Sequence, residues 1–114
     1  MITLELLRTF CLALPHVTED VKWGHDLCFS IGGKMFCVVS MEDSLKVSLK
    51  VSEGEFDELI NLPGIKPAPY VARYHWIWIE DETVFTRPKW ERYIKQSYDL
   101  VFSKLPKKIL AGLR

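Results

Sequence analysis

The chain has 114 residues, of which 48% are apolar and 26% are charged, and its formal net charge is zero. This length suits one domain with a hydrophobic core of its own, and we expect a single domain over residues 1–114. The balanced charge excludes a disordered charged tail. It also excludes a global field that would attract nucleic acid or anionic lipid, so any polyanion site must be a local patch.

Residues 2–14 are predicted to form a helix, because apolar residues recur there at helical spacing and Pro15 follows. Glu5 and Arg8 interrupt what would be the apolar region of a signal peptide, and no run approaches the roughly 18 apolar residues of a membrane span. The odd number of cysteines, without paired spacing, favours reduced thiols and a cytoplasmic protein. All three are expected to pack in the core: Cys11, Cys28 and Cys37.

Three sequential strands are predicted next, over residues 27–31, 34–41 and 45–51. The first two flank Gly32 and Gly33, which is the signal of a two-residue hairpin turn. A further short strand around residues 21–23 is an option that the pattern leaves open.

The second half of the chain alternates helices with strands. Ser52 is expected to cap a short helix, and three prolines and a glycine in LPGIKPAPY, residues 62–70, predict no regular element there. A strand is predicted over residues 74–81 and a short one at residues 84–85. The longest helix is expected over about 87–104, followed by a last basic turn. The sequence therefore predicts an α+β fold with two layers, an antiparallel sheet with helices on one face, in the order helix, three strands, helix, two strands, helix.

No set of residues points to catalysis, a metal or a cofactor. The glycine pair lacks the further glycine and hydroxyl of a phosphate-binding loop, and the three histidines have no partners at zinc spacing. Most aromatic residues occupy periodic apolar positions, so we expect them mainly in the core, although aromatic platforms can also stack bases. We expect a protein without catalytic residues, metal or cofactor.

The strand LKVSLKV, residues 45–51, alternates strictly and should bury Leu45, Val47, Leu49 and Val51 on one face. The opposite face then carries Lys46, Ser48 and Lys50, with the two lysines about 13 Å apart along the strand. This face could simply keep the sheet soluble and discourage edge pairing. It could instead contact phosphates, with Ser48 donating between the lysines, or contact a small ligand.

Five segments occur in an order that resembles the MmcQ/YjbR family of small bacterial proteins. They are CLALPHVTEDVKWG, F…GGKMF, VSLKV, PGIKPAPYVARYHWI and SYDLVFSKLPKK, which together extend from about residue 6 to residue 109. The resemblance implies a compact α+β fold and the family's common DNA-binding label, which rests on two hairpin-bearing parts gripping a duplex. It implies no catalytic residues. The basic positions that match the family's motifs are Lys34, Lys50, Arg73, Lys104, Lys107 and Lys108, and strand parity adds Lys46 and Ser48.

Two functions therefore remain in view. The first is a non-enzymatic module that binds DNA through these local basic patches. The alternative is a small-ligand or protein-interaction domain that uses the PAPY loop, in which Tyr70 and the nearby Trp76 would line a pocket. We expect a monomer, with the oligomeric state otherwise left open.

Overall fold

The fold is described from a computed structural model covering residues 1–42 and 44–113. In chain order the elements are α1 (Leu4–Ala13), β1 (Val17–Lys22), β2 (Asp26–Ile31), β3 (Lys34–Ser40), β4 (Lys46–Lys50), α2 (Glu53–Leu59), β5 (Ile65–Pro67), η1 (Ala72–Tyr74), β6 (Trp76–Ile79), η2 (Glu82–Val84), α3 (Arg87–Phe102) and α4 (Lys107–Gly112). The elements η1 and η2 are short 3₁₀ helices.

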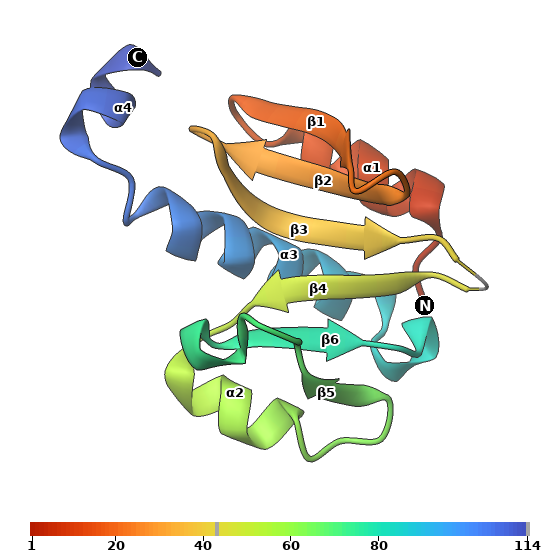
Figure 1. Ribbon diagram of the computed structural model, residues 1–114. Coiled ribbons are helices and arrows are strands. Elements are labelled where there is room, and N and C mark those ends of the chain that lie inside the picture. The colour runs from red at the N-terminus through yellow and green to blue at the C-terminus, as the bar shows by residue number, and fades with distance from the viewer. Residues whose placement is uncertain (43, 114) are drawn as a thin grey trace.

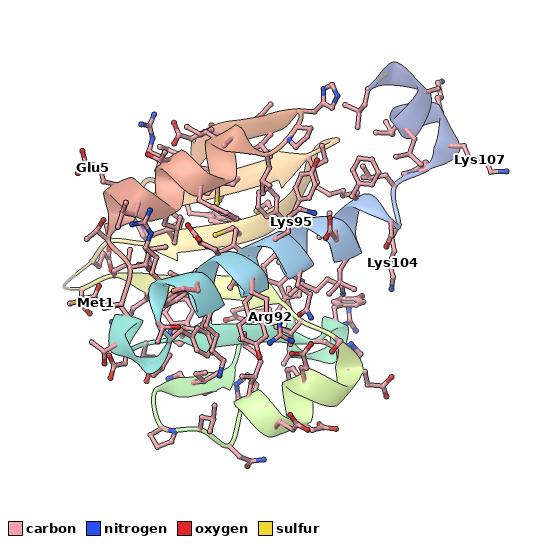
Figure 2. The ribbon with its side chains drawn as sticks, turned by 180° about the vertical axis from the view of Figure 1, so that it is seen from behind. Met1, Glu5, Arg92, Lys95, Lys104 and Lys107 are labelled. Atoms are coloured by element: carbon pink, nitrogen blue, oxygen red, sulfur yellow. The ribbon has the colours of Figure 1, made fainter. Side chains whose placement is uncertain are left out.

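The strands form one antiparallel sheet in the order β1-β2-β3-β4-β6-β5. Helices α1 and α3 lie behind this sheet in Figure 1 and in front of it in Figure 2, so both cover the same face. Helix α2 lies beside β5 and β6, and α4 lies beyond the C-terminal end of α3 (Figure 1). The predicted α+β class, with helices on one face of an antiparallel sheet, is confirmed. In the described part of the chain, no helix is both long enough and apolar enough to cross a membrane.

Strand β4 has the predicted parity. Val47 and Leu49 are 1% and 0% exposed and belong to the main core cluster, as does Val51 just after the strand. Helix α3 covers this face of the sheet (Figure 2). It contributes Trp90 and Ile94 to the same core cluster, and both are fully buried. The alternation of the sequence was therefore sufficient to identify the buried face of the strand.

The predicted hairpin turn is also present and has a second use. Gly32 and Gly33 adopt positive φ angles of 59° and 80°, as a tight turn between twisted strands requires. A Cβ atom on Gly32 would come within 2.8 Å of side-chain carbons of Leu105 and Ile109. The turn therefore forms the surface against which the segment from α3 to α4 packs.

Ser97 of α3 joins the helix to the sheet where β3 and β4 separate. Phe36 forms a bulge in β3, because Phe29 pairs with Cys37 while the next residue of β2 pairs with Met35. The Ser97 hydroxyl donates to the Phe36 carbonyl and accepts from the Lys50 amide at 3.0 Å. Ser97 is 0% exposed, so water does not reach its hydroxyl. The hydroxyl therefore gives the Phe36 carbonyl and the Lys50 amide a hydrogen-bond partner inside the protein.

Three expectations for individual strands were wrong. Before α2 the sheet has four strands and not three: the further strand that the pattern left open at 21–23 exists, but it is the edge strand β1, which begins at Val17 and ends at Lys22, before Trp23. The segment 62–70 does contain a strand, β5, in which Pro67 is tolerated because the strand lies at the sheet edge. The predicted strand at 84–85 is replaced by η2 and an extended Phe85, because the Asp81 carboxylate accepts from the Thr83 amide and turns the chain.

Candidate functional site

The face of the sheet away from α1 and α3, called the open face below, carries the even-numbered residues of β4. Ser48 lies opposite Val38 of β3 and Trp78 of β6, and Lys50 lies opposite Trp76. Neighbouring residues in register share a face, so both β6 tryptophans point away from the core. The expectation of core aromatics holds for Trp90 but is wrong for these two.

A hollow of about 510 Å³ lies on this open face. Its walls come from the β1–β2 turn, the middle of the sheet and the loop between β5 and η1. We call it the aromatic hollow, and its lining residues are Trp23, Asp26, Met35, Val38, Ser48, Ala68, Pro69, Tyr70, Val71, Trp76 and Trp78. The structure thus places both Tyr70 and Trp76 in the lining of one hollow, together with Ser48.

Two of the lining aromatics are unusually exposed. Trp23 is 64% exposed and Tyr70 is 98% exposed. Both have positive φ angles, 54° and 69°, which are uncommon for residues other than glycine and carry a conformational cost. Folding alone gains little from two large aromatic side chains held in this way on the surface.

Asp26, the first residue of β2, is the charged residue of the lining. Its Oδ1 atom is buried, and among the described residues it has no hydrogen-bond partner. The His25 imidazole lies beside it, with Nε2 3.6 Å from Oδ1, which is beyond hydrogen-bond distance. An unpartnered carboxylate oxygen beside apolar walls is costly, so a group that supplied a positive charge there would be favoured.

A second hollow of about 390 Å³ lies between α3, α4 and the start of β1, with Tyr98, Phe102 and Leu110 among its lining residues. The Tyr98 hydroxyl donates to the Pro15 carbonyl at 2.8 Å in its wall, so this polar group already has a partner. The aromatic hollow is the stronger candidate because it combines exposed aromatics with an unpartnered polar atom.

Some of the candidate basic residues come together at the end of the sheet where β4 and α3 end (Figure 1). The Lys50 ammonium donates to the Tyr74 carbonyl at 2.6 Å, and the Arg73 guanidinium lies 4.8 Å from the Tyr74 ring centroid. Partial burial lowers the pKa of Lys50, and the nearby positive charge of Lys104 lowers it further. Two ammonium groups that repel each other in this way form a local patch of positive charge.

The remaining lysines at this end are exposed. Lys34 follows the hairpin turn that α4 covers, and Lys104 and Lys107 point away from the protein in Figure 2. Together we call this set the basic end: Lys34, Lys50, Arg73, Lys104, Lys107 and Lys108. Within residues 1–42 and 44–113, none of the set forms an ion pair.

Lys46 and Ser48 do not join the basic end. Ser48 is 7% exposed and lies in the aromatic hollow, so its hydroxyl is not presented to solvent between two lysines. Lys46 lies at the other end of β4 near Glu80, whose pKa is lowered chiefly by a hydrogen bond from Lys66 and to a lesser degree by Lys46. The row of Lys46, Ser48 and Lys50 expected from strand parity shares one face, but its members have different surroundings.

The cysteines are free thiols and buried, with Cys11 and Cys37 in the core cluster. Burial raises the pKa of the Cys37 thiol well above its ordinary value, so the thiol stays protonated and unreactive. Cys28 is buried but lies on the side of the open face, opposite Val38. Within the described ranges, no three histidine, cysteine, aspartate or glutamate side chains gather as metal ligands.

A model of the YjbR family matches residues 12–100. The chain belongs to this family. Among solved structures, a Deinococcus radiodurans protein, DR2400, with a DUF419 domain superposes with a TM-score of 0.87 at 26% identity, covering 99% of this chain and 88% of that one. A Pseudomonas syringae protein superposes with a TM-score of 0.72 at 17% identity, covering 88% of this chain and 99% of that one, and supports the fold alone. No curated protein matches the chain.

The family match agrees with the resemblance read from the five segments and leaves function open, because YjbR membership by itself names no ligand and no reaction. Sequence reasoning missed Trp23, Asp26 and Trp78 as residues of one site. The available signals were the two tryptophans on one parity of WIWI and a tryptophan directly before Gly24. Nothing in the sequence indicated that the β1–β2 turn faces the PAPY loop across the sheet.

Proposed function

We propose that this YjbR-family protein is a small-ligand-binding domain whose site is the aromatic hollow. The observation that carries the proposal is the position of its aromatics: three of the four tryptophans and Tyr70 line one hollow on the sheet face that the helices leave open. Ligand sites are typically concave, largely apolar and supplied with a few polar groups, with volumes of about 300–1,000 Å³. A volume of about 510 Å³ lies within this range.

The exposed aromatics strengthen the proposal. Tyr70 and Trp23 stand at high exposure on turns with positive φ angles, although burial of either side chain would stabilise the fold. Strained residues of this kind cluster at active sites and ligand clamps, where the surrounding structure holds them in place. Ser48 and Asp26 add one hydroxyl and one carboxylate that could orient a ligand.

The composition of the lining supports binding without catalysis. Among the described residues of the hollow, Asp26 is the one carboxylate, and no histidine, cysteine or lysine accompanies it. Acid–base and nucleophilic catalysis most often use histidine, cysteine or lysine beside a second polar group, and none of these three is among its described lining residues. The hollow instead offers the flat rings of three tryptophans and a tyrosine, and its lining is mainly apolar.

Tryptophan fluorescence tests the proposal. Three tryptophans line the hollow, whereas Trp90 is fully buried and its indole N–H donates to the Glu82 carbonyl at 2.9 Å. Titration with cationic, neutral and anionic benzyl compounds should change the emission saturably for at least one probe. Trp78→Ala should abolish this change.

Tyr74→Ala is the matched control, because Tyr74 is also a large exposed aromatic, at 51%, but does not line the hollow. This variant should bind as the wild type does. If no probe produces a saturable change, or if Tyr74→Ala loses as much affinity as Trp78→Ala, the aromatic hollow is not the site.

A second candidate function is DNA binding through the basic end. The supporting observation is the proximity of Lys50 and Lys104: partial burial lowers the pKa of Lys50 most, and the positive charge of Lys104 lowers it further. Phosphate groups would relieve this repulsion, and each neutralised phosphate of a duplex contributes about −0.9 to the slope of log K against log salt concentration. The zero net charge of the chain and the hydrogen bond that already holds Lys50 both weigh against it.

Fluorescence anisotropy with a short labelled duplex, titrated across salt concentrations, tests this candidate. Replacing Lys50 and Lys104 by Gln should reduce the slope by roughly two units. Lys46→Gln should leave the slope unchanged, because Lys46 lies near Glu80 at the other end of β4. Absence of binding by the wild type at low salt would exclude duplex DNA as a partner.

A further inference from the structure

We infer that the ligand of the aromatic hollow is a small organic cation, an ammonium group attached to an apolar body, held by the Asp26 carboxylate and the faces of the surrounding tryptophans. This inference rests on the proposed function and specifies the chemistry of the same site. It depends on three features of the hollow: its charge, its aromatic walls and the unpartnered oxygen within it.

The first feature is the unpartnered oxygen. Asp26 Oδ1 is buried and lacks a hydrogen-bond partner among the described residues, and its side chain is 21% exposed. The carboxylate therefore loses much of its hydration without gaining a hydrogen bond from the described residues, and the His25 imidazole beside it keeps its Nε2 atom 3.6 Å from Oδ1. An ammonium group beside Oδ1 would supply both the missing charge and, where it carries N–H groups, the missing hydrogen bond.

The second feature is the aromatic walls. The two β6 tryptophans lie on the same side of one strand, opposite Ser48 and Lys50, and Trp23 and Tyr70 approach from the two turns. The face of an indole or phenol ring carries negative electrostatic potential and attracts cations within about 6 Å, most strongly for tryptophan. Aromatic walls next to a carboxylate therefore favour a cation over a neutral or anionic ligand of the same shape.

The third feature is the distribution of charge around the hollow. Lys22 lies opposite Asp26 in the β1–β2 register, and Lys46 and Lys50 flank Ser48 on the same face of β4. Lys66 of β5 lies opposite Trp78 and is ion-paired with Glu80, and the Lys50 ammonium donates to the Tyr74 carbonyl. These lysines are on the open face, yet none is a lining residue and none forms an ion pair with Asp26 within the described residues. The charged group that would touch a bound molecule is therefore one carboxylate, set among aromatic rings, aliphatic side chains and the Ser48 hydroxyl, whereas the neighbouring lysines lie outside the lining.

A comparison of three probes tests the inference. Benzyltrimethylammonium is a permanent cation, benzyl alcohol is neutral and phenylacetate is an anion, and all three carry one benzene ring. We expect the cation to bind at least tenfold more tightly than the other two, measured by tryptophan fluorescence and by shifts of the indole N–H signals in NMR spectra of the full chain. The Trp90 indole signal, which belongs to the core, should not move.

Asp26→Asn provides the decisive variant, and Asp20→Asn is its matched control. Asp20 lies on the same face of the sheet, opposite Cys28, but outside the hollow, so its replacement removes an equal charge without touching the site. Asp26→Asn should weaken binding of the cation at least tenfold and leave binding of benzyl alcohol unchanged. Asp20→Asn should change neither by more than about twofold, because it alters only the screened long-range field.

The stability of the variant without ligand is a second readout. Because Oδ1 of Asp26 has no hydrogen-bond partner among the described residues, Asp26→Asn should unfold at the wild-type temperature or above it. A clearly lower unfolding temperature would show that the carboxylate stabilises the fold and would overturn the inference. Equal binding of all three probes, or tighter binding of phenylacetate, would also overturn it while leaving the proposed ligand-binding function in place. Failure of every probe to bind would instead remove the proposed function itself.

Discussion

Replacing Ser97 by alanine tests how the helix layer is joined to the sheet. The hydroxyl of this fully buried residue bonds both to the Phe36 carbonyl and to the Lys50 amide, at the point where the β3–β4 ladder ends with the pair Cys37 and Leu49. Removing one oxygen atom therefore leaves one carbonyl and one amide without this partner. The space that it vacates is smaller than the volume a water molecule needs.

The magnitude follows from these two groups. Each buried backbone group left unpaired costs about 1–3 kcal/mol, and the higher helix propensity of alanine returns at most about 0.5 kcal/mol. We expect Ser97→Ala to lower the free energy of unfolding by about 2–5 kcal/mol. For a domain of 114 residues, the average unfolding entropy of about 2.1 cal/mol/K per residue converts this into a fall of roughly 8–21 °C in the unfolding temperature.

Urea titration and thermal scans followed by circular dichroism measure both quantities. Ser103→Ala is the control, because Ser103 immediately follows the same helix and is exposed, and its hydroxyl bonds only to the Leu100 carbonyl at 2.9 Å. This control should lose less than about 0.5 kcal/mol, as expected of a surface substitution. If Ser97→Ala were no less stable than Ser103→Ala, the bridge would not stabilise the junction, and the argument from unpaired backbone groups would be refuted.

Three further predictions concern the core, acid stability and the thiols. Leu49→Asp should prevent folding, because it places an unpaired charge at a fully buried position. Val21→Asp, at a 60% exposed position of the edge strand, should fold. A normal thermal transition for Leu49→Asp would contradict the assignment of the core face. The pKa of Glu55 is lowered chiefly by a hydrogen bond from Gln96, so its contribution to stability is present above the ordinary carboxyl pKa of about 4.3 and is lost as the pH falls through the lowered value in the folded protein. Glu55→Gln should therefore be less stable than the wild type at neutral pH and approach it in acid, and a constant difference across pH in denaturant titrations would disprove this. Mass spectrometry of unreduced, alkylated protein should find three free thiols, at Cys11, Cys28 and Cys37. An internal disulfide between any two of them would contradict the structure.

The sequence determined the parts of this protein that depend on local pattern. Period-two alternation identified Val47 and Leu49 as buried, and the glycine pair identified the hairpin turn, because strand parity and turn geometry are properties of neighbouring residues. The class of fold followed from the order of these elements. Ser52 was likewise identified as a helix cap from its place before the acidic first turn, and its side chain accepts from the Glu55 amide.

The tertiary structure decided what lies outside those local rules. The edge strand β5 exists because Ile65 pairs with Ile79 of β6, a partner 14 positions later, and local proline content cannot reveal this pairing. The polar bridge by Ser97 likewise depends on a β-bulge and a helix 61 residues away from it. Pairing and bulges of this kind are set by the packing of the whole chain.

The candidate site belongs to the second group. The alternation of β6 showed that Trp76 and Trp78 share a face, but only the packing of α1 and α3 decided that this face is the open one. Trp23 lies in the turn after the edge strand β1, and Tyr70 lies in the loop after the other edge strand, β5. Both residues line the same hollow on the open face, which only the strand order of the whole sheet explains. The sequence by itself therefore determined which residues point the same way along each strand. The tertiary structure decided which of those faces meets the helices and which remains available to a ligand. The reason is that burial of apolar surface depends on the packing of the whole chain and not on neighbouring residues alone.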